Sequence, residues 1–272
     1  MAVDLKKLAR KEVVLFLALA FGLSSIFYYL IATSTSNLLL FTVALMWCPA
    51  VAAILTRFYC QKNFKGFGFG WGETKWQLVG ILLPIAIGLA MFGSVWLFLG
   101  DFNAEKAAQI FSLSFLPTFA IMLAFNLFTV LGEEIGWRGL LVPEMSKFMG
   151  FTKLALLSGT IWMAWHLPII IFGTYHGVGP LWYSLAMFVP SVIGAGVVLA
   201  WLRLKSGSIW PAVLFHGFWN YFIQSIYPAL TIQTEASNMI TGEFGWASSA
   251  MYVLLAFLCW HYRYLLPKVK KS

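Results

Sequence analysis

The feature that most constrains this chain is a succession of apolar stretches, each long enough to cross a lipid bilayer. A helix needs about 20 residues to cross about 30 Å of hydrocarbon. Eight such stretches predict eight spans, near residues 12–33, 37–57, 77–99, 113–134, 153–172, 181–202, 209–228 and 247–266. The sequence therefore predicts an all-α, polytopic membrane protein that forms a single transmembrane domain over residues 1–272.

The composition agrees with a membrane protein, because only 10% of the residues are charged and 61% are hydrophobic, against about 25% charged residues in a soluble domain. The net charge of +8 is explained by where the Lys and Arg residues lie relative to the expected spans. If the N-terminus is cytoplasmic, every Lys and Arg except Lys106 falls on the inner side, as the positive-inside rule requires. We therefore expect an integral, multi-pass membrane protein with both termini in the cytoplasm and no nucleic-acid partner. The expected outer connections carry four acidic residues, Asp101, Glu105, Glu235 and Glu243.

Two local features do not change this expectation. The basic start and apolar run of residues 4–33 imitate a signal peptide, but the run is longer than a signal peptide requires and no small-x-small cleavage site follows, so an uncleaved first span is predicted. The three cysteines, Cys48, Cys60 and Cys259, form no C-x-x-C pair, and they predict neither a disulfide framework nor a thiolate metal site.

The stretch "LFTVLGEEIGWRGLLVP", residues 127–143, places three ionisable side chains at the end of the fourth apolar stretch. Glu134 and Arg138 are four residues apart, so they share a helix face and can form an ion pair. Glu133 is turned about 100° away and is left without a local cation. An unpaired carboxylate within the membrane is typical of a functional site. Gly132 and Gly136 have the small-xxx-small spacing that lets a neighbouring helix approach closely.

Two further spans contribute groups of the same chemical kind. His166 follows Trp162 by four residues in the fifth span, and His216 and Asn220 are four apart in the seventh. Taken singly, a buried histidine is more often structural than functional. A carboxylate, two imidazoles and an amide on three membrane helices instead indicate one shared polar site, within a motif-bearing core at about residues 113–228.

These groups are suited to peptide hydrolysis. Glu133 can accept a proton from water, His166 can hold that water or move the proton, and His216 with Asn220 can donate to the oxyanion. A metal version stays open, in which Glu133, His166 and His216 bind zinc as a His₂Glu set. Because the chain has no H-E-x-x-H motif, and because Glu133 would be used up as a ligand, the metal-free interpretation is favoured: no cofactor is expected, with zinc as the alternative.

At these residues the sequence resembles the CAAX protease and bacteriocin-processing family of intramembrane endopeptidases, and is similar to its type 2 CAAX prenyl proteases. The resemblance rests on "EEIGWRG", "WMAWH" and "HGFWN", in that order. It implies cleavage of a peptide or protein substrate, prenylated in some members, near its C-terminus and in contact with membrane lipid. It also implies that Glu133 and His166 activate water, that His216 and Asn220 stabilise the oxyanion, and that Glu134 and Arg138 support the site.

Two other functional classes stay open from the sequence. One is a non-catalytic protein such as the bacteriocin-immunity members of the same family. The other is an ion-coupled transporter that uses Glu133 and His166, although the outer halves of the spans offer almost no polar path. The positions of Glu133 and His216 near the expected inner ends of their spans predict a shallow site that substrate reaches from the cytoplasmic side.

Overall fold

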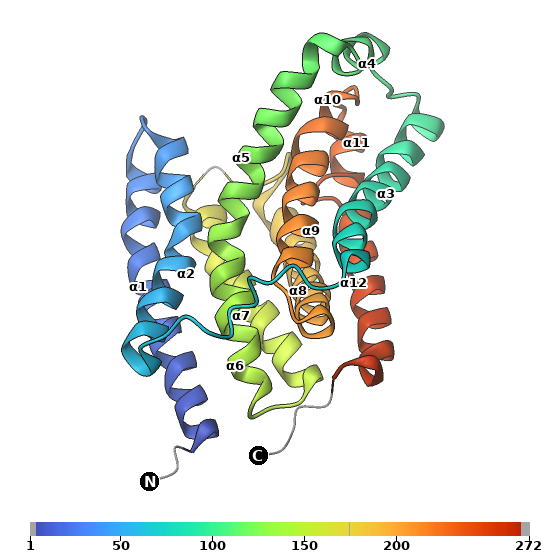
Figure 1. Ribbon diagram of the computed structural model, residues 1–272. Helices are drawn as coiled ribbons and strands as arrows, with labels where there is room; N and C mark the ends of the chain where they lie inside the picture. Colours follow the sequence, from blue (N-terminus) through green and yellow to red (C-terminus); the bar gives the residue numbers. More distant parts are fainter. Residues whose placement is uncertain (1–3, 174, 268–272) are drawn as a thin grey trace.

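The computed structural model describes residues 4–173 and 175–267, and this part of the chain is almost entirely helical (Figure 1). It contains no β-strand, only one isolated bridge between Phe102 and Thr231. The elements, in chain order, are α1 (Leu5–Thr33), α2 (Leu38–Gln61), α3 (Thr74–Leu99), α4 (Ala104–Ile110), η1 (Leu113–Phe115), α5 (Leu116–Glu134), η2 (Ile135–Leu141), α6 (Val142–Ser146), α7 (Phe151–Ile171), α8 (Leu181–Ser206), α9 (Trp210–Tyr221), η3 (Phe222–Ile226), α10 (Tyr227–Ala229), α11 (Glu235–Ile240), α12 (Trp246–His261) and η4 (Tyr262–Leu265).

The expectation of an all-α membrane protein is confirmed, because six helical stretches in the described residues are long and apolar enough to cross a membrane. They match the first six expected spans, and the chain is an integral membrane protein. The seventh and eighth expected spans correspond to α9 and α12, which are 12 and 16 residues long. The count of eight spans therefore stays a prediction, although the chain remains helical from 210 to 229 through η3 and α10.

The fourth span differs from its expected limits. It was expected to end at residue 134, directly after the two glutamates, but the helical stretch runs from Leu113 to Ser146. The π-helical segment η2 carries it past Arg138 without a break. The expected end was wrong because a cluster of charged side chains marks the end of a span only when those charges reach water, and here they are buried.

The helix ends follow local chemistry. The Asp4 side chain accepts hydrogen bonds from the backbone N–H groups of Lys6 and Lys7 and so caps α1. Gly100 and Gly207 end α3 and α8 with φ of 74° and 72°. That left-handed conformation is easily reached only by glycine.

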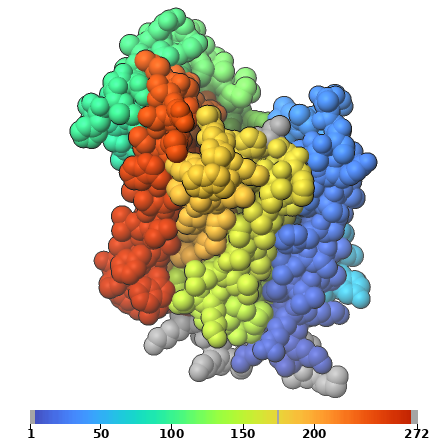
Figure 2. Space-filling model, turned by 180° about the vertical axis from the view of Figure 1, so that it is seen from behind, coloured from blue at the N-terminus to red at the C-terminus, as the bar shows by residue number. Residues whose placement is uncertain are grey.

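The helices form a bundle in which α1 pairs with α2, α2 contacts α5, and α9 lies between α5 and α3 (Figure 1). On the other side α1, α7, α8 and α12 lie side by side (Figure 2). The start of α1 and the end of η4 lie at the same end of the bundle, at the bottom of Figure 1, and we call this the terminal end. The three helices that carry the motifs, α5, α7 and α9, surround the centre.

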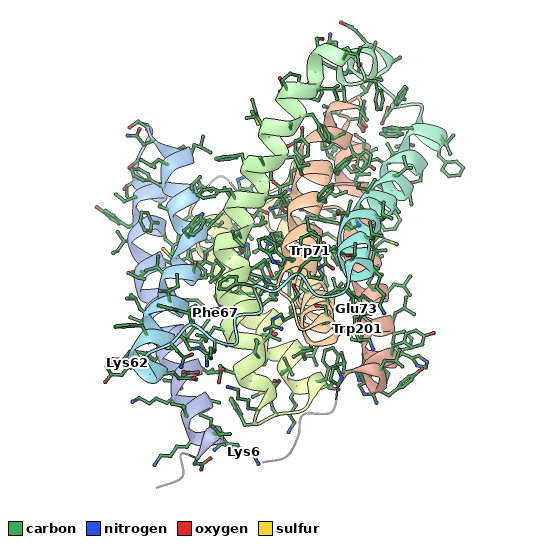
Figure 3. The ribbon with its side chains drawn as sticks, viewed as in Figure 1. Lys6, Lys62, Phe67, Trp71, Glu73 and Trp201 are labelled. Carbon is green, nitrogen blue, oxygen red and sulfur yellow. The ribbon has the colours of Figure 1, made fainter. Side chains whose placement is uncertain are left out.

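An extended segment, residues 62–73, joins α2 to α3 and crosses the front of the bundle, with Phe67 and Trp71 along it (Figure 3). Phe67 is 1% exposed, and its ring lies 5.6 Å from the Arg57 guanidinium. Arg203 Nη2 donates to the Gly66 carbonyl at 2.9 Å, and Trp210 Nε1 donates to the Phe69 carbonyl at 2.8 Å. These contacts fix the segment against the helices that carry the site.

A buried ionic cluster ties the terminal end together. Arg57 Nη2 donates to Glu144 Oε1 at 2.8 Å, and Arg57 Nη1 lies 3.6 Å from Glu12 Oε2. Glu144 also accepts a hydrogen bond from Lys147 at 2.6 Å. The cluster joins α1, α2 and α6, and it gives each of its buried glutamates a cationic partner, as charges in an apolar interior require.

Candidate active site

Glu134 is the ionic centre of the site. Its Oε1 accepts a hydrogen bond from Arg138 Nη1 at 2.8 Å, so the pair expected from the four-residue spacing is formed. The same oxygen lies 3.0 Å from His216 Nδ1. A carboxylate oxygen only accepts, so His216 Nδ1 donates and the other ring nitrogen, Nε2, is left for another partner. The sequence predicted the first of these contacts and not the second.

Trp162 links four of the six motif residues. Its indole Nε1 donates to Glu133 Oε2 at 2.8 Å, and its carbonyl lies 2.9 Å from His166 Nδ1. Its ring lies 4.2 Å from the Arg138 guanidinium and 5.2 Å from the His216 ring centroid. Since a carbonyl only accepts, His166 donates from Nδ1 and its Nε2 is left with the lone pair when the ring is neutral.

All six motif residues are buried, and four of them line one cavity. Their exposed fractions are 2% for Glu133, 0% for Glu134, 2% for Arg138, 8% for His166, 7% for His216 and 9% for Asn220. A cavity of about 310 Å³ is lined by Glu133, His166, His216 and Asn220, together with Trp162. Glu134 and Arg138 lie outside this lining, behind His216 and Trp162. The expectation that the first four act and the last two support them stays a prediction.

The helix that carries the glutamates and the helix that carries Asn220 each continue into a π-helical turn. Glu134 is followed by η2, in which the backbone N–H of Val142 donates to the Trp137 carbonyl five residues back. Asn220 and Tyr221 are followed by η3, in which the N–H of Tyr227 donates to the Phe222 carbonyl. Single π-turns inside α-helices are frequent at functional sites, because the inserted residue re-aims the neighbouring side chains. Arg203 Nε also donates to the Arg138 carbonyl within η2, at 2.8 Å.

The glycine pair beside the glutamates packs against α2, as its spacing predicted. A Cβ at Gly132 would lie 2.7 Å from the Met46 carbonyl oxygen, and one at Gly136 would lie 2.4 Å from the Pro49 Cβ. Contacts this short cannot be relieved by turning a side chain alone, because backbone atoms of α2 are also involved. The close approach holds the Glu134–Arg138 segment against α2.

The residues proposed for zinc do not form a ligand set in this structure. Among the described residues, no three His, Cys, Asp or Glu side chains are grouped so that they could hold a metal ion. The Nδ1 atoms of His166 and His216 are already committed to the Trp162 carbonyl and to Glu134. These hydrogen bonds leave both Nε2 atoms able to bind a metal, which is how metal-ligating histidines are commonly held, so zinc stays open as the alternative.

Several polar residues of the cavity lining did not enter the predicted site, among them Tyr175, Gln224 and Glu243. Gln224 continues the four-residue spacing of His216 and Asn220, and that spacing was a usable signal. Tyr175 and Glu243 come from two different loops, and the Tyr175 hydroxyl donates a short hydrogen bond to Glu243 Oε2. No local pattern predicts that these two loops meet.

The cavity reaches chain connections that the sequence did not place near the site. The sequence predicted a shallow site at the terminal end, but the helix that carries Glu133 continues to Ser146 on that side. The loop residues that line the cavity, Tyr175 and Glu243, belong instead to the connections at the opposite end, between α7 and α8 and between α11 and α12. The cavity thus extends toward the end of the bundle opposite to the termini.

Comparison with known proteins supports the motif assignment. Residues 114–222 match the sequence pattern of the family described as Rce1-like type II CAAX prenyl endopeptidases. A CAAX prenyl protease 2 of Methanococcus maripaludis is 30% identical over 143 residues, which cover 50% of this chain and 48% of that protein. The chain thus spans about half the length of the curated relative that it matches. The residues that match this family, 114–222, include all six motif positions, and the resemblance to the CAAX protease family is confirmed over that part of the chain.

Proposed function

We propose that this protein is an intramembrane endopeptidase that hydrolyses a peptide bond near the C-terminus of a lipidated, CAAX-type protein. The observation that carries the proposal is the gathering of Glu133, His166, His216 and Asn220 around one cavity. The family match supplies the reaction class, and the similarity to a CAAX prenyl protease 2 of Methanococcus maripaludis supplies the substrate class.

In the proposed reaction Glu133 is the general base. Its Oε2 accepts from the Trp162 indole, which leaves Oε1 to take a proton from a water molecule. His166 accepts the second water proton as a hydrogen bond at Nε2, since its Nδ1 faces the Trp162 carbonyl. The water oxygen attacks the scissile carbonyl carbon, and a tetrahedral oxyanion forms.

His216 and Asn220 stabilise that oxyanion by hydrogen bonds from Nε2–H and from the side-chain amide. Because His216 Nδ1 donates to Glu134, both ring nitrogens of His216 must carry protons for Nε2 to donate as well. When the intermediate collapses, the C–N bond breaks and Glu133 passes its proton to the leaving amine. Glu134 and Arg138 touch no reacting atom and hold His216 in place.

The direct test is cleavage of a farnesylated C-a-a-X peptide by the purified protein, with Glu133→Gln and Glu134→Gln measured alongside. We expect Glu133→Gln to lose at least about 100-fold in kcat, since a general base contributes about 10²–10⁴-fold, and to keep its thermal stability. Glu134→Gln should lose both activity and stability, because the buried Arg138 is left without its carboxylate.

Three outcomes would each contradict a part of the proposal. A Glu133→Gln protein as active as wild type would show that another group is the base. Activity that is abolished by a chelator and restored by added zinc would favour the metal-dependent version of the same protease. An unlipidated peptide cleaved equally well would remove the lipidated substrate class while leaving the endopeptidase in place.

A further inference from the structure

Glu243 is a second carboxylate in the cavity, and the proposed reaction does not use it. It lies in the turn between α11 and α12, and it lines the same cavity as Glu133, His166 and Asn220. Burial raises the pKa of Glu243, and the side chains of Tyr175, Gln224 and Trp219, with the nearby His216, oppose that rise. Burying a carboxyl group in a largely apolar cavity costs free energy, which contacts within the fold or a bound ligand must offset.

The fold treats its other buried glutamates differently. Glu134 is paired with Arg138, and Glu12 and Glu144 share Arg57. Within the described ranges, Glu243 has no Lys or Arg within ion-pair distance, and no Lys or Arg lines the cavity. Carboxylates that support the fold are paired with a cation, whereas the two that face the cavity, Glu133 and Glu243, are not.

Aromatic rings join Glu243 to the reacting end of the cavity. Tyr175, which donates to Glu243, lies 6.3 Å from His166 and 6.0 Å from Phe188 between ring centroids. Phe188 in turn lies 5.5 Å from His166 and 5.1 Å from Phe244, the residue after Glu243. A carboxylate beside aromatic faces is the surrounding that attracts an ammonium or guanidinium group, through charge and cation–π interactions.

We propose that Glu243, Tyr175 and Phe188 form a subsite that receives a Lys or Arg side chain of the peptide substrate, in a position adjacent to the bond held at His166. The inference rests on the proposed function insofar as the bound peptide is called a substrate. The subsite itself is defined by the cavity and can be tested by binding alone. It makes Glu243 a specificity-determining residue. The same argument disfavours substrates that place a carboxylate in this part of the cavity.

The test measures binding and cleavage of one peptide series by the purified full-length protein in detergent. Each peptide is a fluorescent, farnesylated C-a-a-X peptide in which Lys, Met or Glu occupies one of the positions around the cysteine in turn. At one position we expect wild type to bind the Lys peptide at least about tenfold more tightly than the Met peptide, and the Glu peptide more weakly than the Met peptide. Fluorescence anisotropy gives Kd, and chromatography of the products gives kcat/KM.

Two variants separate the charge from the contact between the loops. Glu243→Gln keeps an oxygen that accepts from Tyr175 and removes the charge, so the ratio of Lys to Met affinity should fall to about one. Tyr175→Phe removes the hydroxyl and keeps both the ring and the charge, so the preference for Lys should remain. These expectations are ratios within each protein, so a general loss of stability does not imitate them.

Equal binding of Lys and Met peptides at every position by wild type would overturn the inference. So would a preference for Lys that survives in Glu243→Gln and disappears in Tyr175→Phe, because the pair would then only join two loops. If the Lys peptide binds preferentially but no peptide is cleaved, the subsite stands and the proposed protease activity fails. If peptides are cleaved without any Lys preference, the activity stands and the subsite fails.

Discussion

At the scale of single residues, Trp162 shows how an apolar core can position a polar site. Glu133 faces a general difficulty, because a carboxylate in an apolar interior needs hydrogen-bond donors to hold it in one orientation. Trp162 supplies that donor from its indole while its backbone carbonyl orients His166 on the same helix. Trp162 thus orients both side chains that are proposed to activate water, Glu133 and His166.

This arrangement predicts that Trp162→Phe lowers kcat about tenfold or more while the protein still folds. An aromatic ring is kept, although it is smaller than indole, and the specific loss is the indole N–H, which leaves a buried acceptor unsatisfied at a cost of about 1–3 kcal/mol. The measurement is kcat on a farnesylated peptide together with the melting temperature in detergent.

Trp165→Phe is the matched control for that prediction. Trp165 lies on the same helix, is equally buried, and donates its indole N–H to Ser24 Oγ at 2.8 Å rather than to a glutamate of the site. Both variants should lose similar stability, and Trp162→Phe should lose far more kcat. Equal losses of kcat in the two variants would mean that Trp162 has no special role in positioning Glu133.

Residue spacing predicted part of this site for a physical reason. The Glu134–Arg138 pair lies within one helical turn, where position along the chain fixes position in space. The contact of His216 with the same carboxylate joins residues 82 apart in sequence, and no helical spacing determines it. His216 was correctly expected in the site, but the contact through Glu134 that orients it was not.

At the scale of elements, the π-turns distinguish the motif helices from ordinary spans. η2 carries Arg138 and follows Glu134, and it is held between α2 on one side and Arg203 on the other. Sequence patterns of apolar residues predicted the existence of α5, but they did not predict that it would continue through buried charges as a π-turn. The energy that permits this comes from tertiary contacts, namely the Arg203 hydrogen bond and the glycine contact with α2.

The glycine contact predicts a specific defect in Gly136→Ala. The added Cβ would meet Pro49 of α2 at distances as short as 2.4 Å, so α2 and η2 must separate, with a cost of about 1–3 kcal/mol for an overpacked contact. Because η2 carries Arg138, the melting temperature and kcat should fall together.

Gly22→Ala provides the comparison. Gly22 is also a helical glycine, but nothing lies within 4 Å of a Cβ placed there. Its replacement should be neutral or stabilising by up to about 1 kcal/mol, because alanine favours the helix. If Gly136→Ala were as stable and as active as Gly22→Ala, close packing against α2 would not be what holds the Glu134–Arg138 segment.

At the scale of the whole molecule, the way the helices assemble decides which residues become the site. The sequence predicted that polar groups from α5, α7 and α9 converge, and they do. It did not predict that Tyr175 and Glu243 would meet across the cavity, because they belong to loops that are brought together only when α8 packs between α7 and α12. The loops that carry Tyr175 and Glu243 lie at the end opposite to the termini, and the expectation that substrate reaches the site from the cytoplasmic side stays a prediction.

The orientation of the bundle in the membrane then decides which compartment supplies the substrate. The distribution of Lys and Arg predicts that the terminal end is cytoplasmic, which would make the Tyr175 and Glu243 loops face the other side. Single cysteines can test this in a protein whose native Cys48, Cys60 and Cys259 are replaced by serine. Suitable positions are Lys65→Cys in the segment between α2 and α3, Gln109→Cys in α4 and Val178→Cys beside Tyr175, all of which are exposed.

We expect a membrane-impermeant maleimide to label Gln109→Cys and Val178→Cys in intact cells, and to label Lys65→Cys only after permeabilisation. That result would place the Tyr175 and Glu243 loops on the non-cytoplasmic side, so a substrate from the cytoplasm would have to reach the site from the terminal end or between helices. The reverse labelling would refute the positive-inside prediction and would place these loops in the cytoplasm. Labelling of Gln109→Cys and Val178→Cys in opposite compartments would contradict the fold itself, because both belong to connections at the end opposite to the termini.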